Sequence, residues 1–268
     1  MSIENIIVLI KGGGEMASGV AHRLSKCHFK VCMTEIPKPQ AVRREVSFCE
    51  AVYEGEKTVE GITAKRVNSY DEVEEAWNSD QMPLIVDATS LIKDILKPDV
   101  IVDAIMAKKN LGTKITDAPL VIALGPGFCA GKDAHLVVET KRGHNLGKII
   151  KEGEAEKDTG IPGLIAGFSI ERVLRAPTNG TLSIIKEIGT SVEAGAIVAF
   201  VNDLPITTQI NGIIRGLLRD GAEVWKGMKT GDVDPRGIKE YCYSISDKAS
   251  AIGGGVLEGI LSHLNRRG

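Results

Sequence analysis

Three consecutive glycines join an apolar run to a helical pattern near the start of the chain. Residues 6–10 are apolar and mostly β-branched, as in a buried parallel strand. After the glycines at 12–14, apolar residues recur at helical spacing over 16–24, and 29–34 form a second strand-like run. The order strand, glycine turn, helix, strand predicts a βαβ unit at the start of an α/β domain.

The glycine turn fits a phosphate-binding pattern. Gly12, Gly14 and Ala17 match G-x-G-x-x-A, in which glycines allow a tight turn and close approach of a pyrophosphate to a helix N-terminus. Glu35 ends the second predicted strand, where an acid would accept hydrogen bonds from ribose hydroxyls and favour NAD over NADP. Against this, Glu15 in the first helical turn would repel a phosphate, and the glycines could serve the turn alone.

Later segments continue the alternation. Residues 84–88, 119–124 and 135–140 read as strands, whereas 71–77 and 99–109 read as helices. This order predicts an α/β fold with a doubly wound, Rossmann-like parallel sheet.

Other residues could complete the predicted cofactor site. Arg43 and Arg44 could clamp phosphates from a loop, or form a solvated basic pair. Asp87 follows a strand and could contact a ligand, or cap a helix. The predicted cofactor-binding residues are Gly12, Gly13, Gly14, Glu15, Met16, Glu35, Arg43, Arg44, Asp87, Ala88, Gly125 and Gly127.

A second group of chemically active residues follows the Gly-Pro-Gly-Phe loop at 125–128. If 135–140 is a strand, His135 and Glu139 share one face and suit general acid–base catalysis. A polar edge strand with surface histidines is the alternative. The predicted catalytic residues are His135, Glu139, Arg142, His144 and Cys129. Because the group lacks the spacing of a metal-binding motif, we predict no metal site.

The sequence pattern changes from helical periodicity to short β-type runs after about residue 175. Glycine-punctuated β-type runs repeat at an offset of 32, so that Asn179-Gly180 aligns with Asn211-Gly212. We predict a duplicated, lipoyl-like barrel-sandwich domain, without the carrier lysine because 199–209 contains none. Asp232 and Asp234 could bind a cation, but we expect them in a solvated loop. The predicted domains are 1–174 (Rossmann-like, nucleotide-binding), 175–238 (lipoyl-like β domain) and 239–268 (C-terminal strand and helix).

The composition of the chain argues against some classes of binding partner. A net charge of −2 and only 4% aromatic residues argue against nucleic acid. The chain has five cysteines with no CxxC pair, no signal-peptide pattern and no apolar run long enough for a membrane span. We therefore expect a cytoplasmic protein with no membrane partner, and a homo-oligomer by default.

Long segments of the chain resemble the YqeB family, named as a selenium-dependent molybdenum hydroxylase system protein. The segments are KGGGEMASGVAHRL, MTEIPKPQAVRREVSFCEAVYEG, LGPGFCAGKDAHLVVETKRGHNLG, DTGIPG, ERVLRAPTNG, KTGDVDPRG and SDKASAIGGGVLEGIL. The first half also resembles the Rossmann half of XdhC-type accessory proteins. The resemblance implies a maturation factor that binds molybdenum cofactor or another nucleotide-type ligand and serves a molybdenum hydroxylase client. The alternatives are an NAD-dependent oxidoreductase using His135 and Glu139, and a non-catalytic ligand-binding scaffold.

Overall fold

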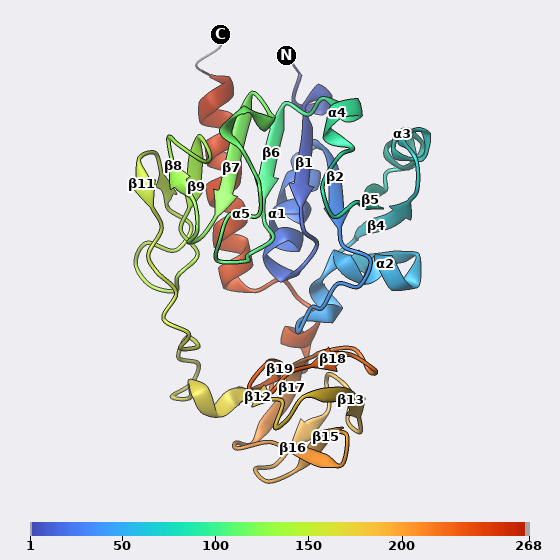
Figure 1. Cartoon of the computed structure of the whole chain (residues 1–268), viewed down its shortest axis with the longest axis vertical. Coiled ribbons are helices and arrows are strands. Elements are labelled where there is room, and N and C mark those ends of the chain that lie inside the picture. The colour runs from blue at the N-terminus through green and yellow to red at the C-terminus, as the bar shows by residue number, and fades with distance from the viewer. Residues whose placement is uncertain (1, 266–268) are drawn as a thin grey trace. The chain divides into compact units, whose positions relative to one another are not determined.

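A computed structural model describes residues 2–265, and the chain divides into two compact units (Figure 1). Unit 1 comprises Met1–Pro39, Ser47–Asp158 and Ile245–Gly268, and unit 2 comprises Gln40–Val46 and Thr159–Ser244. Each unit therefore contains segments that are distant in the sequence.

Unit 1 is built on a nine-stranded sheet with the order β10-β9-β7-β6-β1-β2-β5-β4-β3. Its strands are β1 (Ile7–Lys11), β2 (Lys30–Glu35), β3 (Glu56–Val59), β4 (Ile62–Val67), β5 (Met82–Val86), β6 (Val100–Asp103), β7 (Leu120–Leu124), β9 (Leu136–Val138) and β10 (Ile149–Ile150). The seven inner strands from β4 to β9 are parallel, whereas β3 and β10 pair antiparallel at the two edges. A separate short antiparallel pair joins β8 (Cys129–Ala130) to β11 (Gly153–Glu154).

The predicted fold class is wrong for this unit, because the sheet is mixed and the strand–helix alternation breaks down. The predicted helix at 99–109 is strand β6 followed by irregular chain, and only a short 3-10 helix (Ile115–Asp117) precedes β7. Residues 100–102 are three consecutive β-branched residues, all at most 2% exposed. Such a short apolar run fits a buried strand as well as a helix, so its periodicity does not distinguish the two structures.

The helices of unit 1 vary greatly in length. They are α1 (Glu15–Lys26), α2 (Ala51–Glu54), α3 (Tyr70–Asn78), α4 (Lys93–Leu96) and α5 (Asp247–Leu264). α1 packs directly on α5 (Figure 1): a Cβ added to Gly19 would lie 2.7 Å from the Cβ of Ala249. A Cβ on Gly259 would lie 3.0 Å from Leu136, so α5 also lies against the sheet. The C-terminal helix thus packs against both α1 and the sheet.

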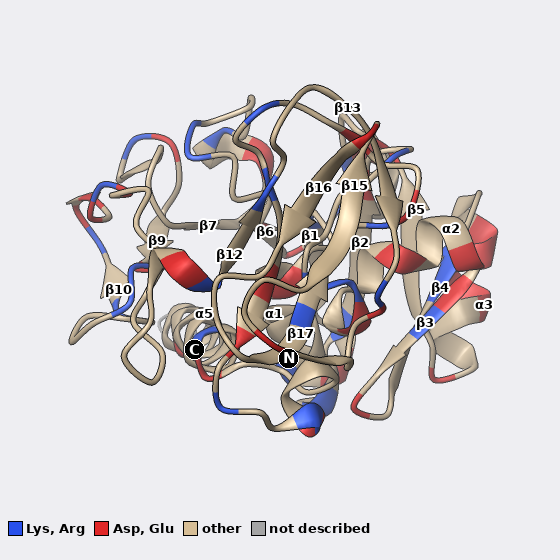
Figure 2. Cartoon of the chain, turned by 90° about the horizontal axis from the view of Figure 1, so that it is seen from below, with Lys and Arg blue, Asp and Glu red and all other residues tan. Residues whose placement is uncertain are grey.

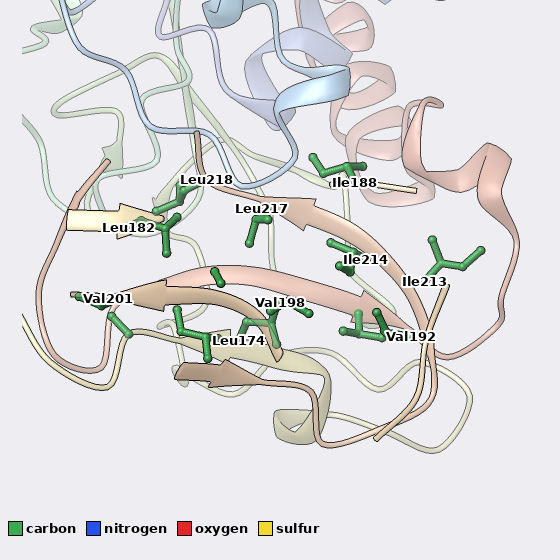
Figure 3. Packing of buried hydrophobic residues seen from close by; sticks show 14 of the residues in the cluster. Leu174, Leu182, Ile188, Val192, Val198, Val201, Ile213, Ile214, Leu217 and Leu218 are labelled. Carbon is green, nitrogen blue, oxygen red and sulfur yellow. The ribbon is translucent and has the colours of Figure 1, made fainter. Parts of the chain in front are cut away.

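Unit 2 consists of two four-stranded antiparallel sheets, with the orders β12-β19-β17-β14 and β16-β15-β13-β18. Their strands are β12 (Val173–Arg175), β13 (Gly180–Ile184), β14 (Ser191–Val192), β15 (Ile197–Val201), β16 (Leu204–Thr207), β17 (Gly212–Leu217), β18 (Glu223–Val224) and β19 (Lys229–Asp234). One hydrophobic cluster, which includes Leu182, Val198 and Ile214, forms the core (Figure 3). The predicted lipoyl-type barrel-sandwich is wrong, because the strands belong to two separate antiparallel sheets.

The last segments differ from the sequence-based expectation. Residues 159–174 lie in unit 2, whereas 245–268 return to unit 1. The strand predicted between 239 and the final helix is wrong, because Lys239–Cys242 forms a 3-10 helix. The final helix itself is confirmed as α5, which begins where the Ser246 hydroxyl accepts a hydrogen bond from the N–H of Ala249.

Charges of both signs are interspersed over the chain, with acidic residues gathered on α3 (Figure 2). This mixture matches the small net charge of −2.

Candidate functional site

The carboxyl ends of the inner parallel strands meet at one edge of the sheet in unit 1. β1 lies between β2 and β6, so the strand order reverses direction at β1. In open α/β sheets, ligands bind outside the carboxyl ends at such a reversal. Lys11, Glu35 and Asp103 are the last residues of β1, β2 and β6 and therefore lie at this edge.

The three glycines of the predicted phosphate-binding loop differ in how closely other residues pack against them. Gly12 has a φ of +95°, and a Cβ there would lie 3.2 Å from the Ala104 carbonyl oxygen. A Cβ on Gly13 would lie 2.9 Å from the backbone nitrogen of Cys49. A Cβ on Gly14 would meet no heavy atom within 4 Å among the described residues. Two glycines thus serve packing, and only Gly14 borders open space.

The N-terminus of α1 begins at this open glycine. Gly14 is the N-cap residue, and no side chain in the described part of the chain caps the helix there. The first N–H groups of a helix have no intrahelical partner and attract anions, helped by the helix dipole. α1 therefore presents backbone donors suited to a phosphate or carboxylate, with Glu15 as an opposing charge in its first turn.

Glu35 does not extend toward a ribose position. Its carboxylate accepts hydrogen bonds from the N–H groups of Gly13 and Ile36, both at 2.7 Å. Burial raises the pKa of Glu35 above its ordinary value, against the lowering effect of these hydrogen bonds. The side chain fastens the glycine turn to β2.

Lys11, Asp103 and Thr113 form a buried polar cluster at the same edge. The Lys11 ammonium donates to the Thr113 hydroxyl at 2.6 Å and lies 3.9 Å from Asp103 Oδ2. The Thr113 hydroxyl donates to the same Asp103 oxygen at 2.5 Å. Sequence reasoning missed this cluster, because it predicted a helix over 99–109, where Asp103 instead ends strand β6. Lysine directly before the glycine run, at the end of a buried strand, was the available signal.

The loop that carries Thr113 contacts both glycine turns that the sequence analysis identified. This loop, residues 104–113, backs against Gly12 through Ala104. At its other side, a Cβ on Gly127 would lie 2.6 Å from the backbone nitrogen of Lys109. Gly127 therefore supports the loop by close backbone packing, whereas the close neighbour of Gly125 is the Thr140 side chain.

Glu139 is a buried structural carboxylate. It accepts hydrogen bonds from the N–H groups of Thr140 and Lys141 at 2.7 Å and of Glu156 at 2.8 Å. Three backbone donors on one carboxylate fix the turn that follows β9. The predicted strand at 135–140 consequently ends at Val138.

The structure does not bring the other predicted catalytic residues together. His135 lies before the amino end of β9, where its Nδ1 accepts a hydrogen bond from Val121 N–H, whereas Glu139 follows the carboxyl end. Arg142 forms two hydrogen bonds of 2.7 Å with Asp247, and His144 is exposed. The Cys129 N–H donates to Asp133 at 2.8 Å.

The two predicted arginine clamps belong to unit 2. Arg43 donates to the carbonyl oxygens of Tyr241 and Ser244 at 2.8 and 3.1 Å. Arg44 donates to Leu217 O and forms an ion pair with Glu187 at 2.7 Å. Both guanidinium groups thus bind residues of their own unit.

Asp87 and Ala88 lie in the turn after β5. The Asp87 carboxylate accepts hydrogen bonds from the N–H groups of Thr89 and Ile92 at 3.2 and 2.9 Å. These hydrogen bonds hold the turn between β5 and α4, and they are not a helix cap, because the N-cap residue of α4 is Ile92 and has no side-chain cap hydrogen bond.

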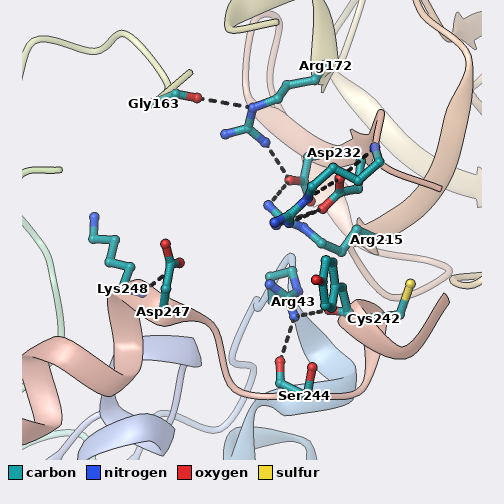
Figure 4. Close-up of polar contacts among 12 residues, drawn as sticks. Arg43, Gly163, Arg172, Arg215, Asp232, Cys242, Ser244, Asp247 and Lys248 are labelled. Carbon is teal, nitrogen blue, oxygen red and sulfur yellow. Dashed lines mark hydrogen bonds and ion pairs between the residues drawn. The ribbon is translucent and has the colours of Figure 1, made fainter. Parts of the chain in front are cut away.

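Unit 2 contains a buried ionic network instead of the predicted solvated loop (Figure 4). Asp232 pairs with Arg172 at 2.8 Å and Arg215 at 2.5 Å, and Asp234 pairs with Arg215 and Arg236. Burial acts to raise the pKa of both carboxyl groups, but the positive charges nearby hold each below its ordinary value. Both aspartates are at most 1% exposed, so the expectation of a solvated loop is wrong.

The chain is similar in sequence to an uncharacterized protein. No protein-family model matches it. YqeB of Escherichia coli (strain K12), an uncharacterized protein, is 48% identical over 255 residues, which are 95% of this chain and 47% of that protein. The chain spans about half the length of the curated relative it matches. This identity over nearly the whole chain supports the resemblance to the YqeB family. The connections to molybdenum hydroxylases and to XdhC-type proteins stay predictions.

Solved structures give only weak similarity. An aspartoacylase family protein from Mesorhizobium loti has a TM-score of 0.26 at 13% identity, covering 85% of this chain and 84% of its own. A succinylglutamate desuccinylase/aspartoacylase from Rhodobacter sphaeroides has the same TM-score and coverage at 15% identity. The ectoine utilization protein EutE (DoeB) from Ruegeria pomeroyi has a TM-score of 0.25 at 9% identity, covering 80% and 61%. Similarity of this size carries no inference about this chain.

No helix within residues 2–265 combines the length and apolar character needed to cross a membrane.

Proposed function

We propose that unit 1 binds a small ligand through a phosphate group, at the N-terminus of α1. The observation that carries the proposal is the uncapped helix start at Gly14, which borders open space at the carboxyl edge where the strand order reverses. Backbone N–H groups and the helix dipole suit a phosphate. The resemblance to the YqeB family adds a context, in which the chain is an accessory protein for molybdenum hydroxylases and the ligand is molybdenum cofactor or a nucleotide.

The positions of the predicted acid–base pair favour binding over oxidoreductase chemistry. His135 and Glu139 lie at opposite ends of β9, and Glu139 is engaged by three backbone N–H groups. Glu35 is engaged by the glycine turn and not directed toward a ribose. The acid–base pair predicted for an NAD-dependent hydride transfer is therefore not assembled at this edge of the sheet.

The test is thermal stabilisation of the full chain by inorganic pyrophosphate, with variants at Gly14. A ligand at one hundred times its Kd adds about 2.7 kcal/mol to the free energy of unfolding. Gly14→Asp should cap α1 with its own carboxylate, stabilise the free protein by about 1 kcal/mol and remove the response to pyrophosphate. The control is Ser246→Asp, which places the same charge at the N-cap of α5 and should leave the response unchanged.

Two outcomes would contradict the proposal. The wild-type chain could show no stabilisation by pyrophosphate, NAD, CTP or molybdenum cofactor, or Gly14→Asp could respond as the wild type does. Stabilisation by molybdenum cofactor or CTP, without a response to NAD, is the result expected of an accessory protein. Stabilisation by NAD alone would support the oxidoreductase alternative instead.

A further inference from the structure

The Lys11 ammonium is buried and contacts polar side chains of the same chain. The residue is 9% exposed, and its ammonium contacts the Thr113 hydroxyl and faces Asp103. The Thr113 hydroxyl bridges the two charges, accepting from Lys11 and donating to Asp103. A buried lysine requires such compensation, so any ligand that uses this ammonium must compete with Asp103.

The loop that supplies Thr113 is held in an unfavourable backbone conformation. Met106 and Lys108 have φ values of +62° and +60°, which side-chain-bearing residues rarely adopt. The Asn110 carboxamide closes the end of the loop by accepting from Gly112 and Thr113 N–H, both at 2.8 Å. Strain of this kind persists only where surrounding contacts maintain it, and it is typical of segments that move at binding sites.

We propose that Lys11 is the anion-binding cation of this site and that loop 104–113 masks it until a ligand is present. This inference rests on the proposed function, because the ligand is the same phosphate-bearing molecule. Lys11 ends β1 directly before the glycine turn that leads into α1, so this residue and the start of α1 belong to the same strand-to-helix connection. The closed loop keeps Lys11 paired with Asp103, and the phosphate replaces that carboxylate when the loop opens.

Masking of Lys11 by the loop lowers the apparent affinity for the phosphate-bearing ligand by an amount that can be calculated. When only a fraction of molecules has the loop open, the apparent Kd is the intrinsic Kd divided by that fraction. Weakening the Lys11–Asp103 pair should therefore tighten ligand binding, whereas removing the ammonium should weaken it. Two neighbours in one buried cluster thus have opposite expected effects.

The experiment is calorimetric titration of full-chain variants with inorganic pyrophosphate. Asp103→Asn keeps the shape of the side chain and removes the competing charge, and should lower the Kd about tenfold. Lys11→Met should raise the Kd by at least about tenfold. Weaker binding by both variants is the result of a purely structural cluster and would overturn the proposal.

A second measurement does not require ligand and keeps the two proposals separable. Thr113→Val removes the bridging hydroxyl and should speed amide hydrogen exchange over 104–113 without changing exchange in α5. Thr63→Val is the control, because it removes a threonine–threonine hydrogen bond on the β3–β4 hairpin. If the wild type fails to bind pyrophosphate, the proposed function fails; if Thr113→Val leaves exchange over 104–113 unchanged, the masking loop fails.

Discussion

Replacing Gly19 by alanine should destabilise unit 1, although alanine favours helices. An added Cβ would lie 2.7 Å from the Ala249 Cβ and 2.9 Å from the Ala249 carbonyl oxygen, closer than carbon atoms normally approach. Alanine gains about 1 kcal/mol over glycine within a helix, whereas forcing a methyl group into a packed contact costs about 1–3 kcal/mol. We expect a net loss of up to about 2 kcal/mol for Gly19→Ala.

Gly254 provides the matched control. It lies within α5, and a Cβ there would meet no described heavy atom within 4 Å. Gly254→Ala should therefore stabilise the chain by about 0.5–1 kcal/mol. Calorimetric unfolding measures both, since 1 kcal/mol shifts Tm by about 2–4 °C in a chain of this size. A Gly19→Ala protein as stable as the Gly254→Ala protein would refute the close packing of α1 on α5.

Three further substitutions test the remaining polar contacts. Glu139→Gln replaces a carboxylate that accepts three backbone hydrogen bonds and should cost about 1–3 kcal/mol in chemical denaturation. Arg215→Met leaves Asp232 and Asp234 with fewer buried partners and should cost about 3–5 kcal/mol. The pKa values of both aspartates lie below their ordinary value of 3.8, so their ionised carboxylates stabilise the fold above pH 3.8. This stabilisation is lost as the pH falls through the lowered pKa values. The stability of Arg215→Met should therefore depend less steeply on pH during acid unfolding. Arg142→Ala removes a pair whose carboxylate is largely exposed, and a double-mutant cycle should give a coupling of no more than about 1 kcal/mol.

Local patterns predicted the start of the chain well. The strand before the glycines, helix α1 and the second strand are confirmed within one or two residues, because the apolar run, the glycines and the helical spacing agree. The failure at 99–109 arose where three β-branched residues fit two periodicities. The sheet topology could not follow from such patterns, because edge pairing depends on contacts distant in the sequence.

The candidate site was predicted only in part. The glycine turn was found, but the contacts of Gly12 and Gly13 with Ala104 and Cys49 join segments far apart in the sequence. Glu35 was correctly placed at a strand end, yet its side chain turns to the glycine backbone instead of outward. Lys11 was missed because its place directly before the glycine run was its one signal, and a single lysine forms no motif.

The most direct test of phosphate binding at α1 is backbone NMR of the full chain titrated with inorganic pyrophosphate. We predict that the largest amide shifts fall on Gly14, Glu15 and Met16, with smaller shifts over 104–113 as the loop responds. Shifts confined to other segments, or no shifts at millimolar pyrophosphate, would contradict the assignment of this edge of the sheet as the binding site.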